Sequence, residues 1–238
     1  SVRNRAQGFL DDDFYSTLRL FADVVGAQER CEDVIAYLEE CRTDLEQRTA
    51  GIPEEEKQRV YTGAVTFNGR HGFAFTYVNF PPFAAIGANN VADVFLESAT
   101  GEAAQEAEQS GTAYVGQNGF EVDLEQILAW DPDVVFLDPG NMDLVNDEYK
   151  SNPGFFSSLR AIQEGEVYAM PSSNAAGPNM TYLMINAYYA GTVLFPDRFA
   201  DVELSEKAGE IMTKLLGRDF FDEMQAGGLA YGKLTIGG

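Results

Sequence analysis

The chain has 238 residues, of which 45% are hydrophobic and 12% aromatic, enough to bury the core of one large domain or two small ones. Its 38 acidic and 16 basic residues give a formal charge of −22, which would repel DNA, RNA and anionic lipid over the whole surface, so nucleic-acid binding is excluded. No apolar run in the sequence reaches the length of a membrane span.

The first fifty residues predict two helices. In the first, which Gly26 ends, the apolar residues at helical spacing are Phe14, Leu18, Phe21 and Val25. In the second, residues 28–49, one apolar stripe lies opposite an acidic face and consists of Cys31, Val34, Ile35, Leu38, Cys41 and Leu45. This helix would be ~33 Å long, and its two cysteines would be ~15 Å apart, beyond disulfide reach. We therefore expect free thiols.

From Arg59 onward, strands alternate with helices. We predict strands at residues 60–67, 133–137 and 167–170, and helices at residues 82–86, 100–110, 155–162, 180–194, 205–216 and 220–224. A further short helix begins after Asp123 and ends at Pro132, with Leu124, Ile127 and Leu128 facing inward. This alternation is typical of a parallel sheet covered on both faces. The fold class is therefore α/β, with one Rossmann-like parallel-sheet lobe flanked by helices and preceded by a long helix.

Three polar loops follow three of the predicted strands, at residues 66–72, 138–141 and 171–179. Because parallel strands end at the same edge of a sheet, we expect these loops to converge on one surface, where ligands of open α/β sheets bind. Aromatic neighbours would form its apolar floor: Phe67, Phe73, Tyr77 and Tyr182. The candidate ligand-binding residues are Asn68, Arg70, His71, Tyr77, Asp138, Asn141, Asn174, Asn179 and Tyr182.

The first loop holds Arg70 beside His71, the only histidine of the chain. Arginine offers a planar fork of donors to a carboxylate, phosphate or oxyanion, and a neutral imidazole ligates iron or donates a hydrogen bond. The pair therefore favours an anionic or metal-chelate ligand. The alternative is structural, with Arg70 paired to a surface carboxylate and His71 satisfying a turn.

The other polar candidates also have two interpretations. Asp138 stands at a strand end and is either a ligand group or the first residue of a turn before Pro139 and Gly140. Asn141 can cap a helix, and Asn179 stands where the helix at 180–194 needs an N-cap. Both interpretations stay open for these residues, because the N-terminus of a helix also binds anions.

The sequence does not favour an enzyme. It contains none of the phosphate-binding, serine-hydrolase or zinc-protease motifs. A single histidine leaves little room for a Ser-His or Cys-His pair, and two cysteines without a clustered histidine make a poor metal site. We expect no catalytic activity, no resident metal ion and no cofactor.

Four segments resemble one known family. The run Glu-Val-Asp-Leu-Glu-Gln-Ile-Leu-Ala-Trp-Asp-Pro-Asp-Val-Val-Phe, residues 121–136, is similar to the helix, Pro-Asp and buried strand of substrate-binding proteins that serve ABC importers of iron complexes, haem and cobalamin. The run Ala-Tyr-Tyr-Ala-Gly-Thr-Val-Leu-Phe-Pro-Asp-Arg-Phe, residues 187–199, and the closing segments 220–224 and 231–236 also resemble that family. The resemblance extends from about residue 12 to the end of the chain.

The resemblance implies a fold of two lobes joined by a rigid spine helix. Since the sequence begins almost at that helix, we expect residues 1–56 to be a helical segment that includes the spine and residues 57–238 to be the carboxy-terminal α/β lobe. The implied function is extracytoplasmic, periplasmic or as a membrane-anchored lipoprotein: capture of a ferric siderophore, haem or related iron chelate and delivery to an ABC permease. Molybdate, tungstate or cobalamin is the alternative cargo. A protein-interaction or sensor lobe without a transport role is the alternative class.

Overall fold

The structure is a computed structural model that describes residues 10, 12–95, 119–174 and 178–237. Its α-helices are α1 Asp12–Val25, α2 Gln28–Thr49, α3 Pro81–Ala84, α6 Leu124–Trp130, α7 Met142–Ser151, α8 Pro153–Ser158, α9 Arg160–Glu164, α10 Met180–Leu194, α11 Leu204–Leu216 and α12 Phe221–Ala226. Short 3-10 helices lie at Glu54–Glu56, Val91–Asp93 and Pro139–Asn141. The strands are β1 Arg59–Gly63, β2 Phe75–Thr76, β3 Asn89–Asn90, β4 Phe120–Glu121, β5 Val134–Leu137, β6 Val167–Ala169 and β7 Gly232–Lys233. The helix predicted at residues 100–110 lies outside the described residues.

The main sheet has the strand order β3-β1-β5-β6-β7. Strand β1 pairs in parallel with β3 and β5, and β5 pairs in parallel with β6, whereas β7 is antiparallel to β6. This mainly parallel sheet confirms the predicted α/β fold. The antiparallel pair β2-β4 forms a second, small sheet that the sequence analysis did not predict.

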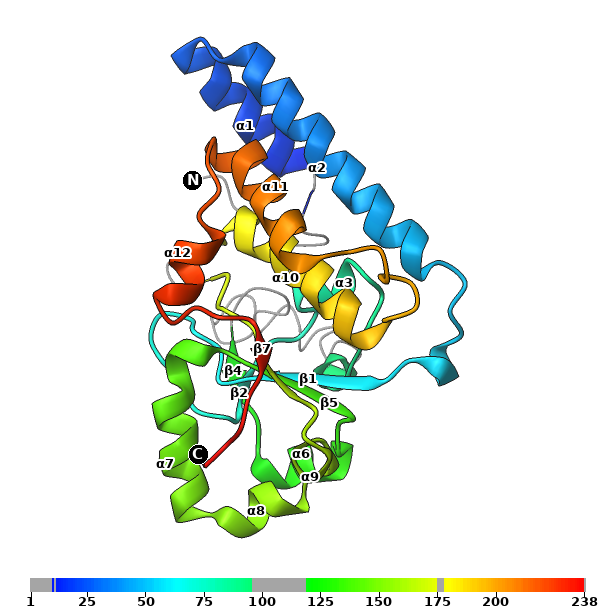
Figure 1. Cartoon of the computed structure of the whole chain (residues 1–238), viewed down its shortest axis with the longest axis vertical. Helices are drawn as coiled ribbons and strands as arrows, with labels where there is room; N and C mark the ends of the chain where they lie inside the picture. The colour runs from blue at the N-terminus through cyan, green and yellow to red at the C-terminus, as the bar shows by residue number, and fades with distance from the viewer. Residues whose placement is uncertain (1–9, 11, 96–118, 175–177, 238) are drawn as a thin grey trace, which may run out of the picture.

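Helices cover both faces of the main sheet (Figure 1). Alternate residues of a strand point to opposite faces, and β5 shows this directly. Phe136 packs in the core shared with α2, α3, α10 and α11, whereas Val135 and Leu137 pack in a second core with residues of α6, α7, α8 and α9. All four residues of β5 are buried, as expected for a central parallel strand.

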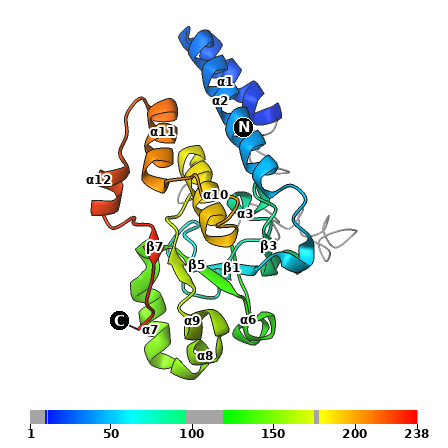
Figure 2. The ribbon, with the colours of Figure 1, turned by 45° about the vertical axis from the view of Figure 1, so that its right-hand side comes forward.

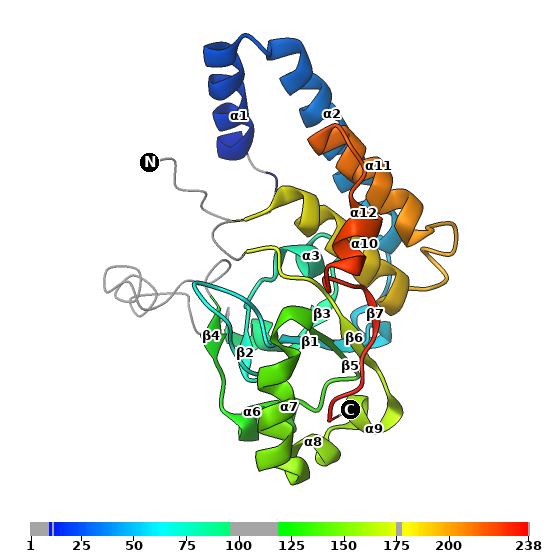
Figure 3. The ribbon, with the colours of Figure 1, turned by 60° about the vertical axis from the view of Figure 1, so that its left-hand side comes forward.

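Helices α1 and α2 form an antiparallel pair that extends beyond the lobe (Figures 2 and 3). The predicted stripe of α2 faces the core: Leu38, Cys41 and Leu45 are almost fully buried, and both cysteines are free. The stripe predicted for α1 is wrong at its carboxyl end, where Phe21 is 64% and Val25 72% exposed. Helix α1 packs mainly against α2, so only part of its apolar surface is covered.

Helix α10 lies at the centre of the upper layer, in contact with α3, α11 and α2. It is apolar on every side because neighbours surround it. Its buried Asn186 donates from Nδ2 to the carbonyl of Pro171 at 2.9 Å and accepts from the hydroxyl of Tyr231 at 2.7 Å. The side chain of Asn186 therefore attaches both the start of the third polar loop, at Pro171, and the C-terminal segment, at Tyr231, to helix α10.

On the opposite face, the helices differ in detail from prediction. The helix expected at residues 155–162 is two helices, α8 and α9, separated by Leu159 in an extended conformation. Ile127 of α6 is fully buried, as predicted, but Leu124 and Leu128 are 37% and 36% exposed, since α6 presents only one edge to the core. Within the described part of the chain, no helix combines the length and apolar character needed to cross a membrane.

Candidate ligand-binding face at the carboxyl ends of the strands

The connections from β1 and β5 leave the sheet in opposite directions. Strand β1 leads through α3 to β3 on one side, and β5 leads through α7, α8 and α9 to β6 on the other. Ligands of open α/β sheets bind at such a switch point, outside the carboxyl ends of the strands. The loops that follow β1, β5 and β6 meet here, and we name residues 64–72, 138–141 and 171–174 the candidate face.

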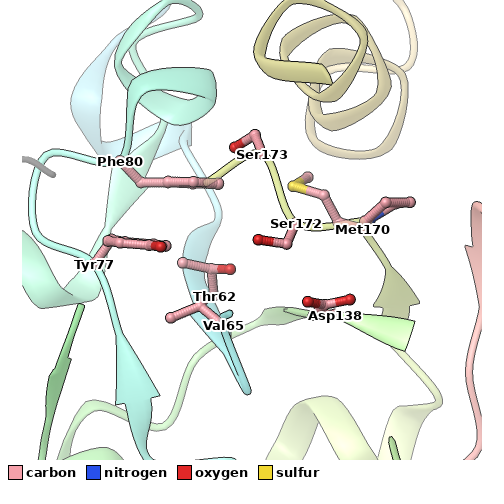
Figure 4. A pocket seen from close by; sticks show the side chains of 9 residues that line it. Thr62, Val65, Tyr77, Phe80, Asp138, Met170, Ser172 and Ser173 are labelled. Atoms are coloured by element: carbon pink, nitrogen blue, oxygen red, sulfur yellow. The ribbon is translucent and has the colours of Figure 1, made fainter. Parts of the chain in front are cut away.

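A small cavity opens on the candidate face (Figure 4). Its lining comes from the ends of all three strands and from the segment before α3: Thr62, Val65, Tyr77, Phe80, Asp138, Met170, Pro171, Ser172 and Ser173. Tyr77 and Phe80 stack on one side of it, with ring centroids 5.3 Å apart, and the carboxylate of Asp138 lies on the other. The volume of about 10 Å³ holds roughly one water molecule, so this cavity alone does not enclose a larger ligand.

The carboxylate of Asp138 is 5% exposed and joins two loops. It accepts hydrogen bonds from the Thr66 hydroxyl at 2.6 Å and from the backbone N–H of Gly140 at 2.9 Å. Burial raises the pKa of Asp138 above its ordinary value, against the opposing effect of these hydrogen bonds. The bond to Gly140 is the turn interaction predicted as the structural alternative, and the same side chain also lines the cavity.

Asn141 is 1% exposed and uses its whole amide inside the protein. Its Nδ2 donates to the carbonyl of Ala64 at 2.6 Å and to the hydroxyl of Thr66 at 3.0 Å, and its Oδ1 accepts from Nε of Arg70 at 3.0 Å. It makes no side-chain cap to α7. Asn141 therefore bridges the first and second loops, and its side chain is not among those that line the cavity.

Arg70 is also held within the protein. Its Nη2 donates to the carbonyl of Gly140 at 2.7 Å and forms an ion pair with Asp143, which lowers the pKa of that carboxyl. The neighbouring His71 stacks on Phe75, with ring centroids 3.6 Å apart, and its Nε2 lies 2.9 Å from the carbonyl oxygen of Phe67. Both residues make the contacts of the structural alternative, a surface ion pair and a turn.

None of the remaining candidates, Asn68, Asn174, Asn179 and Tyr182, is among the residues that line the cavity. Asn179 caps α10, because its Oδ1 accepts from the backbone N–H of Tyr182 at 3.3 Å. Asn174 hydrogen-bonds to Tyr77, which counteracts the rise in the pKa of that tyrosine due to burial. Tyr182 is partly exposed on the first turn of α10, and Asn68 is exposed with a positive φ of 51°.

One expected part of the apolar floor is misplaced. Phe73 is fully buried in the second core, against Phe155 and Phe156, on the far side of the sheet. The sequence analysis also missed residues that line the cavity, among them Thr62, Phe80 and Ser172. Alternation along β1 could have identified Thr62, which is two residues from the core residue Val60. No sequence signal distinguishes the residues of the third loop that line the cavity, Pro171, Ser172 and Ser173, from those that do not.

The sequence model of one protein family, described as periplasmic binding protein, matches residues 1–174. The chain belongs to the periplasmic binding protein family. No curated protein sequence matches it significantly. The described residues contain no group of three or more His, Cys, Asp or Glu side chains arranged to hold a metal ion.

Solved structures of periplasmic binding proteins share this fold. A periplasmic solute-binding protein from Veillonella parvula matches with a TM-score of 0.62 and 18% identity over 89% of this chain. A molybdate periplasmic binding protein from Haemophilus influenzae, solved with molybdate, matches with 0.60 and 20% over 87%. A protein of an Fe³⁺-hydroxamate transport system from Saccharomonospora viridis matches with 0.50 and 22% over 76%. The matches cover 58%, 57% and 55% of those chains, so this chain spans less than two thirds of their length.

Proposed function

We propose that this chain is part of the extracytoplasmic solute-binding component of an ABC importer, which captures a metal complex and delivers it to a membrane permease. The observation that carries the proposal is the candidate face of a periplasmic binding protein, at the switch point between β1 and β5. Its polar groups and two stacked rings form an open floor on which a solute can rest.

The proposed cargo is a ferric siderophore, haem or related iron chelate. A bare oxyanion such as molybdate is held by donors that surround it, and this face holds a cavity of only about 10 Å³. The guanidinium of Arg70, its strongest candidate donor, already has three partners. A large complex that spreads over an open floor fits this geometry better. Molybdate, tungstate and cobalamin remain the alternative cargoes. The fold is shared by a protein described as a molybdate periplasmic binding protein and by one described as part of an Fe³⁺-hydroxamate transport system.

The proposed organisation follows from helix α2. Its 22 residues pack on α10 and α11 along one side, and the helix extends past the lobe with α1 (Figure 3). We assign residues 1–56 to a segment that links two lobes and residues 57–238 to the second lobe. A cargo would then rest on the candidate face while a second lobe covers it, in the periplasm or on a lipid-anchored protein at the cell surface.

Titration calorimetry of the gene-encoded protein tests the proposal. The panel is a ferric trihydroxamate, haem, cobalamin, molybdate and tungstate, and we expect saturable binding of an iron chelate. The variant Ser172→Trp places a large ring over the cavity and should weaken binding at least tenfold, whereas Ser157→Trp, at an exposed position of helix α8 in the opposite layer, should not. Binding of none of the panel, or equal binding by both variants, would reject this assignment.

A further inference from the structure

The charges of the candidate face point to one class of cargo. None of the nine residues that line the cavity is basic, and one of them, Asp138, is acidic. This residue is 5% exposed, so its carboxylate acts through a medium of low dielectric constant, in which charge interactions are stronger than in water.

The carboxylate of Asp138 also has acceptor capacity to spare. An ionised carboxylate accepts about four hydrogen bonds. Thr66, the backbone N–H of Gly140 and the backbone of Ser172 supply three. Asp138 lines the cavity, so a donor from a solute bound there can use the remaining capacity.

The charge of Arg70 does not cancel that of Asp138. The positive charge of Arg70 lowers the pKa of Asp138, but by less than each of the hydrogen bonds from Thr66, Gly140 and Ser172 does. The guanidinium is paired with Asp143, which is itself exposed on α7, so the two charges neutralise each other. The carboxylate of Asp138 is thus the uncompensated charge of the face, in a protein whose formal charge is −22.

We propose that the part of the cargo that rests on this face is cationic, such as an ammonium-bearing arm of a metal complex, and that Asp138 selects it. This inference rests on the proposed function, because it concerns the cargo of the same site. A negatively charged complex or a tetrahedral oxyanion would meet the carboxylate without a compensating donor.

The test compares three ferric complexes that differ in charge at one position. They are the complex of desferrioxamine B, whose free amine is positively charged, its neutral N-acetyl derivative and its anionic N-succinyl derivative. Calorimetry on the gene-encoded protein should rank their affinities in that order. We expect the cationic complex to bind roughly tenfold more tightly than the anionic one, the factor that a charge-assisted hydrogen bond supplies.

Two variants and one control identify the residue. Asp138→Asn keeps the shape of the side chain and should remove the preference for the cationic complex. Asp143→Asn removes the carboxylate partner of Arg70 and should shift the preference toward the anionic complex. Asp147→Asn, on the same helix and paired with Lys150, removes the same charge away from the face and should leave the ranking unchanged. Circular dichroism checks that each variant folds.

The outcomes distinguish a failure of the charge-selection inference from a failure of the proposed solute-binding function. Equal affinities, or tighter binding of the anionic complex, would overturn the inference while leaving the solute-binding function intact. The inference would also be overturned if Asp138→Asn kept the preference for the cationic complex. The same holds if Asp147→Asn reduced that preference as much as Asp138→Asn does. If none of the three complexes binds, the inference fails for this face, and the proposed function is judged by the wider panel of solutes.

Discussion

Asn141 joins the loops after β1 and β5 through hydrogen bonds to Ala64, Thr66 and Arg70. The amide is 1% exposed and Ala64 is fully buried, so removing the amide leaves the Ala64 carbonyl without this partner in a buried environment. A buried polar group without a partner costs more than an average hydrogen bond contributes. The bridge therefore holds the first and second loops of the candidate face together.

We predict that Asn141→Ala lowers the free energy of unfolding by ~1–3 kcal/mol, the cost of leaving buried groups unpaired. Urea denaturation measures the change. The matched control is Asn89→Ala, at a partly buried position of β3 whose side chain makes no hydrogen bond that the described residues record, and it should change stability by less than about 0.5 kcal/mol. Equal effects of the two substitutions would show that the bridge is unimportant.

Asp138 gives the protein a pH dependence of known sign. Burial raises its pKa in the folded state above the ordinary value of 3.8, so the folded state binds the proton more tightly than the unfolded state does. Its contribution to stability therefore declines as pH rises from about 4 through the raised pKa. Asp138→Asn cannot ionise, and its stability relative to the wild type should increase across that range. Urea denaturation between pH 4 and 7 checks this, and a difference that is constant or declines contradicts it.

At the scale of elements, helix α10 connects the candidate face to the upper core. Its first turn begins at Asn179, whose side chain accepts from the backbone N–H of Tyr182, and its body is buried against α2, α3 and α11. A change at the N-cap therefore acts on stability and on the position of Tyr182 together.

We predict that Asn179→Ala lowers the free energy of unfolding by about 1 kcal/mol, the usual cost of losing an N-cap. The substitution Asn179→Asp keeps an acceptor at the same position and should retain the wild-type stability. Chemical denaturation distinguishes the two. If both variants lose the same stability, Asn179 does not stabilise the protein through its N-cap hydrogen bond.

Removing side-chain volume from the buried face of helix α2 should destabilise the protein. Leu45 is fully buried between α2 and the lobe, so Leu45→Ala should cost ~2–5 kcal/mol. Leu20 of α1 is the matched control, since it is 60% exposed and Leu20→Ala should change stability by less than about 0.5 kcal/mol. Thermal and urea unfolding of the two leucine variants measure the contrast. A small effect at Leu45 would mean that α2 does not pack on the lobe as described.

The elements that the sequence predicted well are those with a long or continuous pattern. Val134 to Leu137 form an unbroken apolar run and are a buried strand, and the apolar stripe of residues 28–49 is a helix with those bounds. Strands β2, β3 and β7 have two residues each, too few to show a period. Helix α7 was missed although Asp143 and Asp147 mark a solvated face.

At the candidate face, the sequence located the loops but not the partners of their side chains. Arg70 pairs with Asp143, 73 residues away in the chain, and no local pattern reveals that contact. Phe73 and Tyr77 are equally aromatic and close in sequence, yet the β2-β4 pair and the sheet place them in different cores. Whether the nine candidate residues bind cargo stays a prediction.

For the whole molecule, helices pack on both faces of a mainly parallel sheet (Figure 1), and the loops after β1, β5 and β6 are joined by hydrogen bonds at the carboxyl ends of these strands. The high negative charge keeps such a protein from binding anionic surfaces without a specific contact.

Uptake of a metal complex into vesicles tests this account most directly. The gene-encoded protein is added outside vesicles that contain ATP and a candidate ABC permease from the same organism, with a radiolabelled iron chelate that calorimetry has shown to bind. We predict that uptake requires both the protein and ATP and falls at least tenfold with Ser172→Trp. Uptake that is the same without the protein, or binding that never stimulates uptake, would contradict the central claim.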